Sequence, residues 1–119
     1  MGMVYQHSIP FGSPSQFRLQ MTVTADGHAD MAVLDAFNQP IGNLNHMRAA
    51  LSEVAKLTQP GAEPVRAEGN HSHIVLTRTD DPDWLKVFYA DEEAFMERET
   101  TVMLEEVAAL IEDAKASVG

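Results

Sequence analysis

The chain contains no cysteine, which removes two common ways of stabilising a small domain. Disulfide bonds and zinc sites built on thiolates are both excluded. With 119 residues the chain needs neither device. A domain of this size removes roughly two-thirds of its unfolded surface from water. No apolar run approaches the roughly 20 residues that span a bilayer, and the N-terminus lacks a basic segment followed by an apolar one. We therefore expect a soluble, cytoplasmic protein.

Basic residues are scarce. Eight Lys and Arg stand against 18 Asp and Glu, which gives a net charge of −10. A nucleic-acid-binding protein needs a basic footprint, so no direct contact with nucleic acid is expected, and the same charge disfavours an anionic membrane. Twelve acids lie between Asp80 and Asp113, where Lys86 and Arg98 are the only bases. Such a segment attracts a basic protein surface, for example that of a nucleic-acid-handling protein. The alternative is a solvated face that only keeps the protein soluble.

Motifs of catalysis are missing as well. The sequence has no glycine-rich phosphate loop and no Gly-x-Ser-x-Gly turn. Adjacent acids such as Glu105 and Glu106 diverge on a helix, and general acid or base chemistry would require burial that the sequence does not indicate. We expect no catalytic residues and no cofactor.

A first hairpin is predicted near the N-terminus. Residues 17–24 alternate between apolar and polar side chains, which is typical of a half-buried strand. Asp26-Gly27 is a favoured two-residue turn, and a second strand over 29–37 follows. That turn sets a register with two opposed pairs, Arg18 with Asp35 and Leu19 with Leu34.

A second hairpin is predicted over 72–79 and 84–90, joined by a four-residue turn that contains Pro82. Its register sets four pairs opposite each other: Leu76 with Val87, Ile74 with Tyr89, Val75 with Phe88, and Thr79 with Trp84. Both faces of this hairpin are substantially apolar, so the face without helices needs a cover. A second copy of the chain, the N-terminal arm or a binding partner could provide it, and we expect a homodimer.

Two helices complete the predicted fold. Apolar residues at helical spacing predict one helix over 44–58 and a longer one over 91–117, whose first residues are acidic. Residues 1–15 read as an irregular arm, and residues 59–70, rich in proline and glycine, as a connector. The expected fold is α+β in class. Halves 16–58 and 71–117 of a single domain, 16–119, each follow a strand-strand-helix plan (ββαββα), giving a four-stranded antiparallel sheet with two helices on one face.

The first functional hypothesis is a non-enzymatic acidic protein that docks on a basic protein surface. Its carboxylates would replace phosphates or acids that the partner normally meets, as in inhibitors, immunity proteins, nucleic-acid mimics and secretion chaperones. Occlusion would be electrostatic and steric. A buried structural role is expected for Trp84, and the alternative, which this hypothesis uses, is an interface anchor. The predicted contact residues are Asp80, Asp81, Asp83, Trp84, Glu97, Glu105, Glu106, Glu112 and Asp113.

The second hypothesis is a small-ligand or metal site, with a hydrolase as one possible activity. His71 and His73 are two residues apart at a strand start, so both imidazoles would point to one side. Acids at 68, 80 and 81 could complete a site. No third ligand has a recognisable spacing, and such a histidine pair is commonly only part of a surface.

Overall fold

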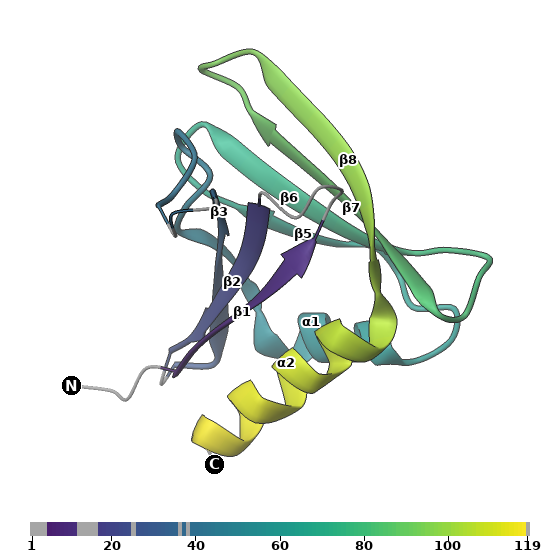
Figure 1. Ribbon diagram of the computed structural model, residues 1–119. Coiled ribbons are helices and arrows are strands. Elements are labelled where there is room, and N and C mark those ends of the chain that lie inside the picture. Colours follow the sequence, from purple (N-terminus) through teal and green to yellow (C-terminus); the bar gives the residue numbers. More distant parts are fainter. Residues whose placement is uncertain (1–4, 12–16, 25, 36, 38, 119) are drawn as a thin grey trace.

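The computed structural model describes residues 5–11, 17–24, 26–35, 37 and 39–118. In this part of the chain, eight strands form one antiparallel sheet in which each strand pairs with the next. The sheet curls, and the helices close its open side (Figure 1). In chain order the elements are β1 (Tyr5–Phe11), β2 (Phe17–Val23), β3 (His28–Leu34), β4 (Met47–Ala50), α1 (Leu51–Ala55), η1 (Lys56–Thr58), β5 (Val65–Glu68), β6 (Ser72–Arg78), β7 (Trp84–Asp91), β8 (Met96–Met103) and α2 (Leu104–Val118).

This architecture contradicts the predicted four-stranded ββαββα plan with two helices on one face. The helix expected over 91–117 begins only at Leu104, because Met96–Met103 pair with β7 as the strand β8. The run Thr100-Thr101-Val102 explains why this segment is a strand, since β-branched residues favour strands over helices. The prediction of one helix over 44–58 is likewise wrong. Met47–Ala50 form the strand β4, and the α-helix α1 that follows is only five residues long.

The arm and the connector were also predicted wrongly. Residues 5–11 are not irregular but form the edge strand β1, which pairs antiparallel with β2. Residues 1–4 and 12–15 of the predicted arm lie outside the described part. The connector over 59–70 contains β5, in which Val65 and Ala67 are buried while Arg66 and Glu68 are exposed. A strand of four residues is too short to stand out beside prolines and glycines in the sequence.

The two hairpins differ in how well their register was predicted. The strands β2 and β3 are confirmed, but the register is wrong: Leu19 lies opposite Val33 instead of Leu34. The backbone N–H of Thr24 donates to the carbonyl of His28 (3.0 Å), so the turn has one more residue than predicted. The register of β6 and β7 is confirmed, with these pairs: Ile74 and Tyr89, Val75 and Phe88, Leu76 and Val87.

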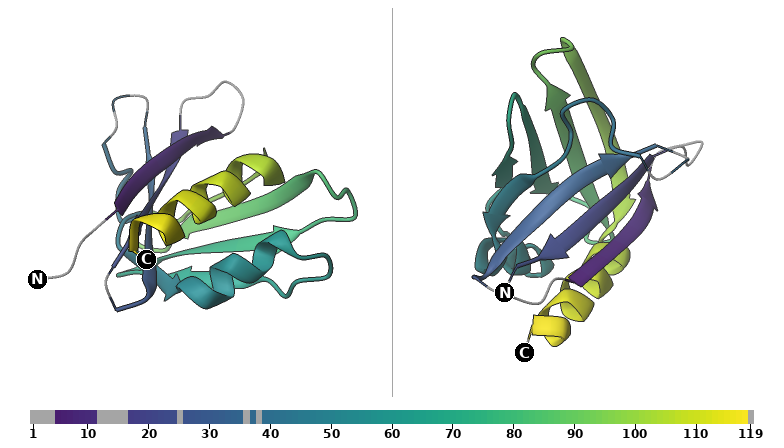
Figure 2. Two further views of the ribbon diagram at one scale, coloured as in Figure 1. Left: turned by 90° about the horizontal axis from the view of Figure 1, so that it is seen from below. Right: turned by 90° about the vertical axis from the view of Figure 1, so that its left-hand side faces the viewer.

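The core lies on the inner face of the curled sheet, where alternate strand residues meet the helices. Met21, Met31 and Leu76 are fully buried there. From α2, the core receives Val107, Leu110 and Ile111. Figure 2 shows α2 running along β1 and β2, so this helix closes the open side of the sheet. The outer face carries the other half of the strand residues. No helix in the described ranges is long and apolar enough to cross a membrane.

Candidate binding groove

The acids within the predicted helix over 91–117 fall into separate groups. Glu97 lies on β8, in the half of that strand remote from α2. Glu105 and Glu106 lie in the first turn of α2, and Glu112 and Asp113 lie further along the same helix. The acidic segment from Asp80 to Asp113 is therefore divided between a strand and a helix, because Met96–Met103 are extended.

One group does converge on a groove, of about 540 Å³, at the junction of β7, β8 and α2. Trp84 at the start of β7 lies opposite Met103 at the end of β8. Both are exposed, Trp84 to 40% and Met103 to 41%. The groove is lined by Thr58, Pro82, Asp83, Trp84, Met103, Leu104, Glu105 and Ala108. Of the predicted contact residues, Asp83, Trp84 and Glu105 therefore share one site.

Hydrogen bonds hold the loop between β6 and β7 in place. The hydroxyl of Thr79 lies 3.0 Å from the carbonyl oxygens of both Asp81 and Trp84. The carboxylate of Asp81 accepts from the backbone N–H of Asp83 (2.9 Å). The carbonyl of Asp83 accepts from the backbone N–H of Leu104 (2.9 Å), which joins the loop to the start of α2. Asp83 and Trp84 are thus presented by a fixed backbone.

The groove is negative. Two of its lining residues, Asp83 and Glu105, are exposed acids, and the lining set includes no Lys or Arg. Glu105 and Glu106 also fit the positive end of the helix dipole, which accounts structurally for their place in α2. The dipole does not account for an exposed indole next to them. The groove therefore combines negative charge with an aromatic and an aliphatic surface.

The remaining predicted contact residues lie outside the groove. Asp80 and Asp81 are exposed in the adjoining loop. Glu112 forms an ion pair with Lys115 (3.6 Å), one turn further along α2. Sequence reasoning missed Met103 as a groove residue, because its exposure depends on its position in β8. The cross-strand neighbour of Trp84 could have been identified only if β8 had been recognised as a strand.

The two histidines of the metal hypothesis differ in backbone conformation. His71 precedes β6 and has a φ of +63°, a left-handed conformation that breaks the expected alternation with His73. His73 lies on the outer face, where its Nδ1 is 3.7 Å from an oxygen of Glu92 and its ring centroid is 5.8 Å from that of Phe88. Within the described ranges, no three His, Asp or Glu side chains are grouped so as to hold a metal ion. The geometry gives the metal hypothesis no support.

A buried acid, Asp91, connects the turn between β7 and β8 to the loop before β4. Its carboxylate accepts from the backbone N–H (2.9 Å) and the side-chain amide (3.0 Å) of Asn43, and from the backbone N–H of Ala94 (3.2 Å). The bonds from Asn43 hold the pKa of Asp91 below its usual value, although burial opposes this shift. Gly42 has a φ of +53° and leaves room for this carboxylate, because a Cβ at this position would overlap with an oxygen of Asp91.

Replacing Asp91 by asparagine is expected to lower the melting temperature at neutral pH and to flatten its dependence on acid. Because the folded pKa is depressed, the ionised carboxylate stabilises the fold above the unfolded pKa, near 4, and this contribution is lost as the pH falls through the folded pKa. Thermal unfolding followed from pH 7 downward measures both effects. Asp113→Asn, at an exposed position of α2, is the control and should retain the wild-type profile.

Comparison with known proteins provides no family. No protein-family model, no curated protein and no solved structure matches this chain.

Proposed function

We propose that this protein is a non-enzymatic binding protein whose acidic groove accepts a basic segment of a partner protein. The observation that carries the proposal is the convergence of Asp83, Trp84 and Glu105 on one groove from two separate segments. A protein that handles nucleic acid is the favoured class of partner, because its basic surface is built to meet phosphates.

An arginine or lysine side chain matches the groove chemically. Its charged end would meet the carboxylates of Asp83 and Glu105, while its face or stem covers the indole of Trp84. A cation over an indole contributes about 0.5–2 kcal/mol, depending on how far it is desolvated. Arginine fits best, since its planar guanidinium both stacks on aromatic rings and binds carboxylates with two hydrogen bonds. Occupation of the groove would block the partner's basic residues from their normal ligand.

A purely solubilising role accounts for less of what is observed. Exposed acids keep a protein soluble, but an exposed Trp84 beside an exposed Met103 works against solubility. Such a pair is understandable at a contact surface, where aromatic residues and methionine are enriched. The homodimer stays a prediction, which sedimentation of the purified protein would test.

Binding can be followed directly, because Trp84 is the only tryptophan of the chain. A peptide of alternating arginine and glycine is expected to change the fluorescence of Trp84 in a saturable manner. The affinity should fall steeply between low and physiological ionic strength, because exposed charges are screened by salt. The double variant Asp83→Asn/Glu105→Gln should bind the peptide about tenfold more weakly.

The matched control is Glu112→Gln/Asp113→Asn, which removes the same charge from α2 outside the groove. At about 0.1 M salt we expect its affinity to stay within about twofold of the wild type, since interactions between exposed charges farther apart than the Debye length of about 10 Å are largely screened. Equal losses in both double variants would show that the peptide responds to overall charge, and the groove would lose its assignment. Capture from a host lysate at low salt would then identify the natural partner.

A further inference from the structure

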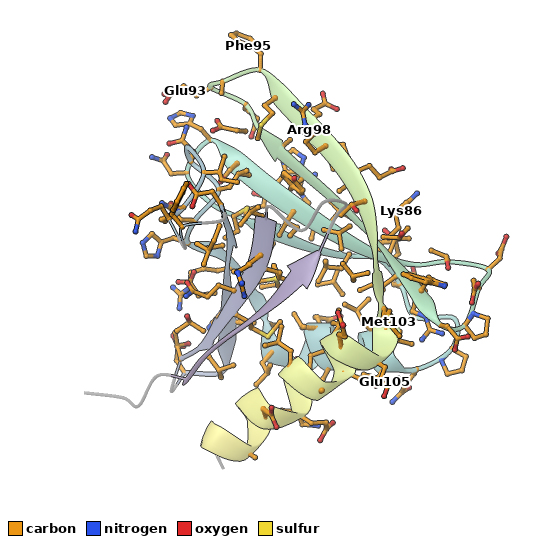
Figure 3. All side chains as sticks on the ribbon, in the orientation of Figure 1. Lys86, Glu93, Phe95, Arg98, Met103 and Glu105 are labelled. Atoms are coloured by element: carbon orange, nitrogen blue, oxygen red, sulfur yellow. The ribbon has the colours of Figure 1, made fainter. Side chains whose placement is uncertain are left out.

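A second pocket, of about 500 Å³, lies at the opposite end of the ribbon formed by β7 and β8. Figure 3 shows Phe95 at the tip of this ribbon and Met103 with Glu105 at its other end. The second pocket is lined by His73, Phe88, Ala90, Asp91, Glu92, Phe95, Met96 and Glu97. Its lining combines the rings of Phe88, Phe95 and His73 with exposed acids and includes no Lys or Arg.

The second pocket includes outer-face residues of the sheet, and the groove lies at the other end of the same ribbon, where Trp84 and Met103 of that face meet η1 and α2. Along β7, Trp84, Phe88 and Ala90 alternate with residues of the inner face. On β8, Met103 lies opposite Trp84, and Glu97 lies opposite Ala90. Trp84 and Ala90 are six positions apart on β7, which corresponds to about 20 Å. One extended segment of a partner that runs along β7 can therefore reach both sites.

Phe95 is exposed to solvent on a turn that hydrogen bonds hold in place. Its side chain is 96% exposed and its backbone has a φ of +53°. The buried Asp91 accepts from the N–H of Ala94, and the N–H of Glu92 donates to the carbonyl of His71 (2.8 Å). An exposed ring and a left-handed backbone both cost stability, and nothing in the described fold uses that ring. A fixed, exposed aromatic residue next to acids is suited to contact a ligand.

The charges of the second pocket select a cation. The carboxylates of Glu92 and Glu97 lie on either side of the turn that carries Phe95. An arginine or lysine side chain can pair with them and cover the faces of Phe88 and Phe95. Between the two sites the outer face carries Lys86, which lies 3.9 Å from Glu99. Because Glu99 offsets the charge of Lys86, this stretch offers a basic residue of the partner little net attraction.

We propose that the second pocket binds a cationic side chain, and that one extended basic segment occupies it together with the groove. This inference rests on the function proposed for the groove, and it specifies the spacing of basic residues in the partner. The segment carries two basic residues about six positions apart, at about 3.3 Å per residue. Further basic residues between them would meet the Lys86–Glu99 pair and add little affinity.

Three synthetic peptides test this pattern. One has a single arginine, one has two arginines at positions i and i+2, and one has two at positions i and i+6, with glycine and serine elsewhere. The i,i+6 peptide is expected to bind about tenfold more tightly than the single-arginine peptide, because its second contact is intramolecular. The i,i+2 peptide should show no such gain, since it cannot span both sites. Fluorescence of Trp84 reports the groove, and the backbone amide resonance of Phe95 reports the second pocket.

The variant Glu92→Gln/Glu97→Gln separates this inference from the function proposed for the groove. It should remove the gain of the i,i+6 peptide while the single-arginine peptide still changes the fluorescence of Trp84. Glu112→Gln/Asp113→Asn again removes equal charge elsewhere and should retain the gain. A gain that survives Glu92→Gln/Glu97→Gln, or an i,i+6 peptide no tighter than a single arginine, overturns the second pocket and leaves the groove assigned. If no peptide changes the emission of Trp84, the proposed function fails with it.

Discussion

Replacing Leu110 by alanine is expected to lower the free energy of unfolding by about 3 kcal/mol. Leu110 is fully buried and belongs to the part of α2 that joins the core of the curled sheet. The loss combines the removed apolar contacts with the cavity that the shorter side chain leaves behind. Because α2 closes the open side of the sheet along β1 and β2, this position tests whether the helix holds the sheet in its curled form.

Urea unfolding at neutral pH measures the change. The control is Glu112→Ala on the same helix, at an exposed position, which should alter the free energy of unfolding by no more than about 0.5 kcal/mol. Alanine suits a helix interior, so neither variant disturbs helix propensity. A loss below about 1 kcal/mol for Leu110→Ala would mean that α2 does not pack on the sheet as described.

The sequence predicted α2 correctly from Leu104 onward because Val107, Leu110 and Ile111 recur at helical spacing and are all buried. It failed for β8 because the alternation of that strand is weak. Glu97, Arg98 and Glu99 are consecutive exposed residues on an edge strand, and only Val102 is buried. A strand with a single buried side chain gives no clear period of two, so the helical pattern of its neighbours extended over it.

The sheet was predicted where both partner strands alternate clearly. The register of β6 and β7 followed from apolar residues on both strands and a turn of known length. The edge strand β1 contains Pro10, which a strand tolerates only where it needs no ladder hydrogen bond. From the sequence, that proline indicated an irregular segment. The eight-stranded sheet could therefore not be predicted in full, because some of its strand pairings leave no local pattern in the sequence.

The groove was predictable only in part, because it too depends on a strand pairing. Asp83 and Trp84 stood out as an acidic turn followed by the only tryptophan, and Glu105 as an acid of the final helix. Their proximity depends on the pairing of Trp84 with Met103, which is a property of the folded ribbon. The kinds of side chain in the groove were predictable from the sequence, but their arrangement follows from the pairing of β7 with β8.

Replacing Trp84 by alanine is expected to weaken binding of the arginine-glycine peptide roughly 30-fold, a loss of about 2 kcal/mol that is typical of an interface anchor. Trp84 is the large aromatic surface of the groove, and its removal takes away both the cation contact and the apolar cover for the arginine stem. Because Trp84 is 40% exposed, its loss should destabilise the fold less than Leu110→Ala does. Titration calorimetry at low salt measures the affinity, since this variant has no tryptophan emission.

Two further variants identify the contribution of the ring. Trp84→Phe retains an aromatic face and should recover part of the affinity, because phenylalanine binds cations more weakly than tryptophan. Trp84→Leu retains apolar surface without a ring, so it should bind almost as weakly as Trp84→Ala if a cation lies over the indole. Wild-type affinity in Trp84→Leu would show that position 84 contributes apolar surface and no cation contact. The carboxylates of Asp83 and Glu105 would then account for the whole preference for basic partners.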